Sequence, residues 1–213
     1  MKRTTHTPDA SPIRLFKSKK DWGAWLEKNH RKSTGLWLRL GKKAPPTLPA
    51  SGGRRVGQPK TPARSVSYKE ALDVALRYGW IDGQKRPENE LTWLQRFVPR
   101  SANSIWSKVN REKALALIAS GEMKAAGLEA VANAKKNGRW EAAYDSPSGA
   151  TVPNDFQAAL DTNARAQAFF EKLDRANRYA VLWRIQTVKK EETRARKIRE
   201  FVTMLERGEK IHS

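Results

Sequence analysis

A carboxylate flanked by two glycines is the residue pattern in this sequence that most resembles a ligand-binding segment. Gly79 and Gly83 enclose Asp82 within the run GWIDGQ, and Gln84 adds an amide beside it. Glycine lets a backbone approach a ligand closely, and at a strand edge such a segment holds its carboxylate in place. Two interpretations stay open, since Asp82 either contacts a ligand or pairs with an arginine. Trp80, a candidate for the same site, is expected to belong to the core.

Two arginines that follow this segment supply groups that would bind an anion. Arg96 falls opposite the glycine-flanked segment in a predicted hairpin, and Arg100 follows Pro99 at the end of that hairpin. A guanidinium binds a carboxylate or a phosphate through two parallel hydrogen bonds. The structural alternative is an ion pair between Asp82 and an arginine, which we favour for Arg96. Arg100 is the predicted ligand contact, because a position just past a strand is freer to face solvent.

A third group of candidate ligand residues stands at a predicted helix start. In the run SIWSKVN, Trp106, Lys108 and Asn110 combine an aromatic ring, a cation and an amide. Free backbone N–H groups at a helix start attract anions. Ordinary capping by Ser104 or Ser107 explains the same residue types for local reasons. Capping is the interpretation that we favour.

The densest run of basic side chains lies near the end of the sequence. The formal net charge is +20, and the excess of Lys and Arg is concentrated before residue 65 and after residue 171. Such a charge favours encounters with an anionic partner, either nucleic acid or an acidic protein. A basic run is usually a solvated surface, but sequence-independent phosphate contacts need only charge. The residues predicted to form an anionic-partner patch are Lys189, Lys190, Arg194, Arg196, Lys197 and Arg199.

Signatures of catalysis, metal binding and membrane insertion are lacking in the sequence. Cysteine is absent, which excludes disulfides and thiolate sites and indicates a reducing compartment. His6, His30 and His212 are scattered, so no metal site and no cofactor are expected. No apolar run approaches the roughly 20 residues that span a bilayer, and no signal-peptide core follows the N-terminus. We therefore expect a cytoplasmic protein. An enzyme that used the Asp82 carboxylate would need a second catalytic group, which the sequence does not identify.

Local patterns predict the elements that hold the first candidates. Ser18 is a predicted N-cap, and the helix after it carries Trp22, Trp25 and Leu26 on one face. Residues 36–40 then alternate like a strand. A helix followed by a strand is therefore expected at the start of the ordered chain.

A second helix and a hairpin are predicted after a segment rich in Pro, Gly and Ser at residues 44–65. The run Ser67-Tyr68-Lys69-Glu70 is a capping box that opens a helix to about Tyr78. Residues 79–86 and 91–98 flank a turn-like PENE segment and are predicted to pair as antiparallel strands. The alternation favours burial of Trp80 or Trp93 against the helices.

Helix formers predominate from residue 104 onward, and the last helix is predicted from about Glu191 to Arg207. Aromatic residues such as Tyr179 and Trp183 are interpreted as apolar bulk. The predicted fold class is α+β, with a small antiparallel sheet flanked by helices in the N-terminal part and an all-helical C-terminal part. The predicted domains are a disordered tail at residues 1–14, an α+β domain at 15–103 with a mobile loop at 44–65, and a helical domain at 104–213.

Several longer blocks carry a family resemblance. They are ALRYGWIDGQ, LQRFVPR, SIWSKVNREK, GRWEAAY, ANRY and KKEETRAR. In these blocks the chain, from about residue 15, resembles the YdeI/OmpD-associated, bacteriocin-protection-like family. The resemblance implies a bacterial protein linked to bacteriocin protection or stress, with a C-terminal helical module and an N-terminal part distantly similar to YjbR/CyaY-like folds. The loop at 44–65 is longer than the family pattern requires.

Two functional hypotheses follow, and neither predicts an oligomeric state. The first is a non-catalytic binding or stress-protection protein that contacts an anionic or protein partner through basic surfaces, since most of the excess charge lies outside the neutral middle of the chain. The second is a small-molecule binding protein or enzyme with a site around Asp82 and Arg100.

Overall fold

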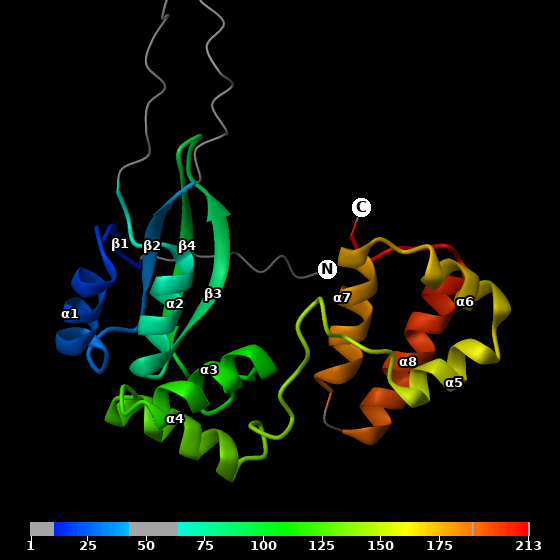
Figure 1. Ribbon diagram of the computed structural model, residues 1–213. Helices are drawn as coiled ribbons and strands as arrows, with labels where there is room; N and C mark the ends of the chain where they lie inside the picture. Colours follow the sequence, from blue (N-terminus) through cyan, green and yellow to red (C-terminus); the bar gives the residue numbers. More distant parts are fainter. Residues whose placement is uncertain (1–10, 43–63, 189, 213) are drawn as a thin grey trace, which may run out of the picture. The chain divides into compact units, whose positions relative to one another are not determined.

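The computed structural model describes residues 11–42, 64–188 and 190–212 (Figure 1). The predicted tail up to residue 10, the predicted loop up to residue 63 and Lys189 lie outside the described residues. The fold is α+β, as predicted, with a four-stranded sheet in the N-terminal part and helices in the C-terminal part. The elements are β1 (Ile13–Arg14), α1 (Lys19–Asn29), β2 (Leu36–Gly41), α2 (Tyr68–Arg77), β3 (Trp80–Pro87), β4 (Thr92–Pro99), α3 (Lys108–Ala119), α4 (Ala125–Lys136), α5 (Asn154–Asp161), α6 (Ala164–Glu171), α7 (Arg175–Gln186) and α8 (Glu191–Glu206).

The chain divides into two compact units that do not follow the predicted boundary after residue 103. Among the described residues, the first unit comprises 11–104 and 113–134, and the second comprises 105–112 and 135–212. Most of α3 and α4 belongs to the first unit, and the start of α4 packs on the end of α2. The backbone N–H of Lys124 donates to the Arg77 carbonyl at 3.0 Å.

The sheet has the strand order β1-β2-β4-β3. The predicted hairpin is confirmed, since β3 and β4 pair antiparallel, and β2 pairs antiparallel with β4 on the other side. Two predictions were wrong at the edge. Ile13 and Arg14 form β1 rather than part of a tail, and β1 runs parallel to β2, so the sheet is mixed. Backbone pairing stabilises this segment, as the N–H of Trp37 donates to the Pro12 carbonyl at 2.9 Å.

Aromatic side chains join α1 and α2 to one face of the sheet. The Trp22 ring lies 5.8 Å from the Phe97 ring and 6.2 Å from the Trp80 ring, measured between centroids, and its indole N–H donates to the Ala71 carbonyl of α2. Trp22, Trp80 and Phe97 are at most 1% exposed, so the predicted burial of Trp80 is confirmed. Trp93 is only half-buried; its ring meets the Tyr68 ring at a tilt of 46°, and the Lys85 ammonium lies 4.6 Å from its centroid.

The capping predictions for the first unit are confirmed. The Ser18 hydroxyl accepts from the Asp21 N–H at the start of α1, and Ser67 and Glu70 form both halves of a capping box at α2. These contacts satisfy backbone groups that a helix start leaves free. They fix where the two covering helices begin.

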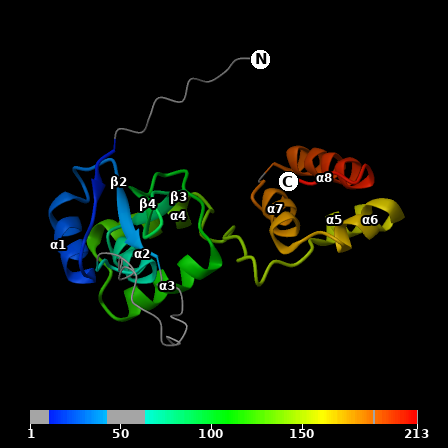
Figure 2. The same cartoon turned by 90° about the horizontal axis from the view of Figure 1, so that it is seen from above.

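The second unit has its own core, formed by α5, α6, α7 and α8. Helix α8 lies beside the other three (Figures 1 and 2). The buried residues of this core are Phe156, Leu160, Ala166, Phe170, Leu173, Val181, Leu182, Ile185, Ile198, Phe201 and Leu205. Ile198, Phe201 and Leu205 form the buried face of α8, which spans the region predicted for the last helix.

Two glycines allow the close approach of α4 to the end of α2. Gly79 has a φ of +69°, and a Cβ there would lie 2.6 Å from the Ala126 carbonyl oxygen. A Cβ on Gly127, inside α4, would overlap the Arg77 carbonyl oxygen and the Met123 sulfur. The missing side chains therefore let two backbones meet.

A pair of glycine-to-alanine substitutions tests this close approach. Gly127→Ala should lower the free energy of unfolding by about 1–3 kcal/mol, because the overlap outweighs the gain of about 1 kcal/mol in helix propensity. Gly23→Ala, in the middle of α1, is the matched control. Its Cβ would meet Val74 at an ordinary 3.6 Å, so this variant should gain up to about 1 kcal/mol. Urea unfolding measures both, and equal shifts in the two variants would contradict the packing described.

Candidate functional site

The glycine-flanked segment does not gather the side chains predicted to share a site. Asp82 pairs with Phe97 across the hairpin, so Arg96 points to the opposite face of the sheet. The Asp82 carboxylate accepts a hydrogen bond of 2.7 Å from the Tyr68 hydroxyl, whereas an Arg96 Nη donates to the Phe97 carbonyl. The favoured Asp82–Arg96 ion pair was therefore wrong.

The remaining candidates on the hairpin have structural surroundings. Trp80 is in the core, and its indole N–H donates to the His30 carbonyl at 3.1 Å. The backbone carbonyl of Gln84 accepts from the side-chain amide of Gln95. Arg100 does not face solvent as predicted, since its Nε and one Nη are buried and its backbone N–H donates to the Gly79 carbonyl.

The helix-start segment is also built into the fold. Trp106 is 2% exposed and meets the Trp140 ring edge-on at 4.9 Å. Lys108 pairs with Asp145, with 2.6 Å between Nζ and Oδ1. The Ser107 hydroxyl accepts from the Asn110 N–H at 3.1 Å, which confirms the capping interpretation.

Carboxylates neutralise part of the predicted basic patch on α8. Arg194 donates two hydrogen bonds, of 2.6 and 2.9 Å, to the Asp155 carboxylate and holds α8 against α5. Arg196 and Lys197 both lie within ion-pair distance of Glu200. Lys190 and Arg199 are exposed. The patch thus presents less positive charge than the sequence suggests.

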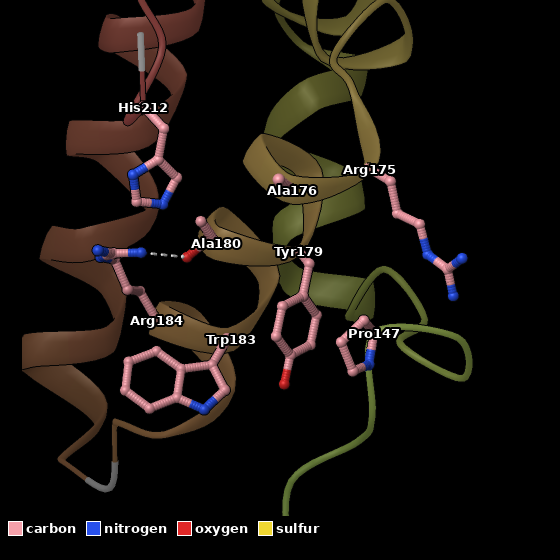
Figure 3. A pocket seen from close by; sticks show the side chains of 8 residues that line it. All are labelled: Pro147, Arg175, Ala176, Tyr179, Ala180, Trp183, Arg184 and His212. Atoms are coloured by element: carbon pink, nitrogen blue, oxygen red, sulfur yellow. Dashed lines mark hydrogen bonds between the residues drawn. The ribbon is translucent and has the colours of Figure 1, made fainter. Parts of the chain in front are cut away.

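A pocket lies on the outer face of α7 in the second unit (Figure 3). Its volume is about 530 Å³, and its lining is mostly apolar. The rings of Tyr179 and Trp183 form its floor, and Ala176 and Ala180 of the same helix line it beside them. The lining residues are Pro147, Arg175, Ala176, Tyr179, Ala180, Trp183, Arg184 and His212.

Two arginines stand at opposite edges of this apolar stripe. Arg175 and Arg184 are nine residues apart, which places them about 180° apart around a helix of 3.6 residues per turn. Figure 3 shows their side chains on either side of Tyr179 and Trp183. Among the described residues, neither arginine lies within ion-pair distance of a carboxylate. Within the described part of the chain, Arg184 donates only to the backbone carbonyl of Ala180, at 2.9 Å.

The buried residue Asp145 anchors the floor of the pocket. The Tyr179 hydroxyl donates to the Asp145 backbone carbonyl at 3.0 Å, and the Asp145 carboxylate accepts from Gln186 at 2.5 Å and from Lys108. Burial, together with the nearby Tyr144 and Asp145, raises the pKa of Tyr179 to about 12. The ring is thus fixed in place with its hydroxyl protonated and directed inward.

Asn177 fixes the chain segment that brings His212 to the pocket. This side chain is 4% exposed, and its oxygen accepts from the backbone N–H groups of Ile211 and His212. Its amide nitrogen donates to the His212 carbonyl and to the Asp174 carboxylate. Three of the four side-chain hydrogen bonds of Asn177 therefore hold residues 211–212 against α7, and the fourth binds the N-cap of the same helix.

Sequence reasoning missed this pocket because it interpreted Tyr179 and Trp183 as apolar bulk of the helical part. The signal that could have identified it is the helical spacing of α7. Asn177, Val181 and Ile185 recur every four residues and are buried, whereas Tyr179 and Trp183 recur at the same spacing on the other side. The face of α7 that carries Val181 and Ile185 packs in the core, so the face with Tyr179 and Trp183 is not needed there.

Neither a metal site nor a membrane span is found in the described part of the chain. Among those residues, no group of three His, Asp or Glu side chains could hold a metal ion. Their helices are all too short or too polar to cross a bilayer.

Comparisons with known proteins match two parts of the chain. Residues 149–208 match the family described as "Bacteriocin-protection, YdeI or OmpD-Associated", which supports the resemblance over the C-terminal helices. Residues 54–130 match a "Domain of unknown function (DUF8412)". These matches do not include a YjbR/CyaY-like family. No curated protein and no solved structure matches the chain.

The pH dependence of stability tests the role of Asp145. Burial alone would raise the pKa of Asp145, but hydrogen bonds from Lys108 and Gln186 and the charge of Lys108 lower it overall. A carboxylate whose pKa falls on folding stabilises the protein above its unfolded pKa of about 3.9. That contribution is lost as the pH falls through the folded-state pKa.

Asp145→Asn should therefore lower the free energy of unfolding at pH 7 by about 1–3 kcal/mol and flatten its decline below about pH 4. Denaturant unfolding at several pH values gives both quantities. Asp161→Asn is the control, because this exposed carboxylate accepts, among the residues that the structure describes, only from neutral glutamine amides. Its loss should change the result by less than about 0.5 kcal/mol. Identical pH profiles for wild type and Asp145→Asn would show that the Lys108–Asp145 pair does not stabilise the fold.

Proposed function

We propose that the protein is a non-catalytic binding protein of the bacteriocin-protection type, which contacts an anionic partner through the outer face of α7. The observation that carries this proposal is the pocket floored by Tyr179 and Trp183 and edged by Arg175 and Arg184. These four residues fall within the segment that matches the bacteriocin-protection family. The pocket is therefore a feature of the part of the chain to which the family description applies.

The chemistry of the pocket suits binding rather than proton transfer. A phenol with a pKa of about 12 stays protonated near neutral pH, and the Tyr179 hydroxyl is already donated to Asp145. Guanidinium groups stay charged at any pH near neutrality. Aromatic side chains and arginines are also the residue types enriched at the energetic centres of interfaces.

Charge supports an anionic partner. The whole chain carries a formal charge of +20, which attracts anions over a distance and increases their rate of encounter. On α8 the charge is partly neutralised by Asp155 and Glu200, whereas the two arginines at the pocket have no such carboxylates among the described residues. A bound anionic partner would supply the negative charge that pairs with these two arginines.

The alternative function, a small-molecule site around Asp82 and Arg100, gains no support from the geometry. Asp82 and Arg96 lie on opposite faces of the sheet, and the guanidinium of Arg100 is largely buried.

Binding titrations with anionic probes test the proposed function. The probes are a labelled 20-nucleotide single-stranded RNA, a DNA duplex and poly-glutamate, each titrated at several salt concentrations and followed by fluorescence anisotropy. At least one should bind, and Arg175→Ala/Arg184→Ala should raise its dissociation constant by at least about tenfold, since each charge-assisted hydrogen bond contributes roughly 1.5–3 kcal/mol.

The control is Arg196→Ala/Arg199→Ala on α8, which removes the same charge away from the pocket. Its effect should be no more than about twofold to threefold. Equal losses in the two double variants would indicate general charge attraction and contradict a contact at α7. If none of the three probes binds at low salt, the proposal of an anionic partner is wrong.

A further inference from the structure

Helix α7 has apolar residues on two opposite faces. Its inner face places Val181 and Ile185 in the core, with both side chains fully buried. Its outer face carries Ala176, Tyr179 and Trp183, which are exposed or half-buried. A helix that is apolar on both faces normally buries both, whereas a surface helix needs only one. The outer face of α7 therefore has the composition of an interface.

The outer face is also shaped as a groove. Small side chains at Ala176 and Ala180 alternate along the helix with the large rings of Tyr179 and Trp183, and Pro147 closes one side (Figure 3). Grooves between ridges of this spacing accept the side chains of another helix. An apolar stripe with a cation at each edge is complementary to an apolar stripe with a carboxylate at each edge.

We propose that the anionic partner is an acidic amphipathic helix of another protein, which lies along α7. This inference rests on the proposed function and names the class of its partner. Apolar side chains of the partner helix fill the groove between Tyr179 and Trp183. Asp or Glu side chains at the two edges of its apolar face accept bidentate hydrogen bonds from Arg175 and Arg184.

The arrangement of the site favours a protein helix over nucleic acid. Single-stranded nucleic acid is bound by a row of cations that follows its backbone and by aromatic faces on which its bases stack. Here the two arginines lie on opposite sides of the helix, about 180° apart, rather than in a row. The floor offers bases few hydrogen bonds, because the Tyr179 hydroxyl is donated to the Asp145 carbonyl beneath it.

Selection from a displayed library tests the class of partner. A library of 18-residue helical peptides with randomised surface positions is panned against the full-length protein, with the Trp183→Ala variant used to remove peptides that bind elsewhere. The enriched peptides should carry apolar residues at intervals of three and four positions, flanked on both sides by Asp or Glu. Thermal unfolding of each variant shows whether it is folded.

A charge reversal then tests the edges of the groove directly. Arg175→Glu/Arg184→Glu should weaken an enriched acidic peptide by at least about tenfold per reversed arginine. The same peptide with Lys in place of its flanking acidic residues should bind the reversed protein better than it binds the wild type. Both arginines lie at the edge of the pocket rather than in the core, so the reversed protein should still fold.

The outcomes separate this inference from the proposed function. The inference is established if acidic amphipathic peptides bind the wild type better and their Lys-substituted versions bind Arg175→Glu/Arg184→Glu better. If the RNA probe binds wild type but not Trp183→Ala, and panning enriches no acidic amphipathic peptide, the α7 contact stands and the protein-helix partner is wrong. If neither RNA nor any peptide depends on Trp183 and the two arginines, both proposals are wrong.

Discussion

The packing of α7 against the core of the second unit is the constraint on which the rest of that unit depends. Val181 and Ile185 are fully buried on its inner face, and Asn177 on the same side holds residues 211–212. Gln186 near its end donates to Asp145, which ties the chain before α5 to the same helix. Because α7 is fixed at these points, its orientation is set, and Tyr179 and Trp183 lie on the face turned away from the core.

The two units use their charged side chains differently. In the first unit several charges stabilise the fold locally, as Arg39 does with Glu88 at the hairpin turn, where each group moves the pKa of the other away from its ordinary value in favour of the charged form. In the second unit Arg194 does the same with Asp155. Arg175 and Arg184 are placed otherwise, since the carboxylates described near α7 are engaged by Lys108, Gln186 and Asn177. Arg175 and Arg184 are therefore available for ion pairs with a binding partner.

Local signals in the sequence predicted much of the fold. The caps at Ser18 and Ser67 depend only on neighbouring residues, and the hairpin depends on alternation around one turn, so both could be identified. Strand β1 could not, because two residues stabilised by backbone pairing leave no side-chain pattern. The attachment of α4 to α2 was also missed, because Gly127 signals a close approach without identifying the segment that approaches.

The candidate site could not be predicted for two physical reasons. A shift of one residue in register moves a side chain to the other face of a strand, so Asp82 and Arg96 looked like partners in the sequence and are separated in the structure. An aromatic residue on a helix face fits a core and an interface equally well, and only the burial of Val181 and Ile185 shows that Tyr179 and Trp183 are not needed inside. Both distinctions require the tertiary structure.

The most direct measurement is an NMR titration of the isotope-labelled protein with an anionic probe that binds it, followed through the indole N–H signals and the backbone amides. A contact on the outer face of α7 predicts that the Trp183 indole and the amides from Arg175 to Arg184 shift first, while the buried Trp22 and Trp80 indoles do not move. Shifts centred on the basic residues of α8, or on the hairpin around Asp82, would contradict the account.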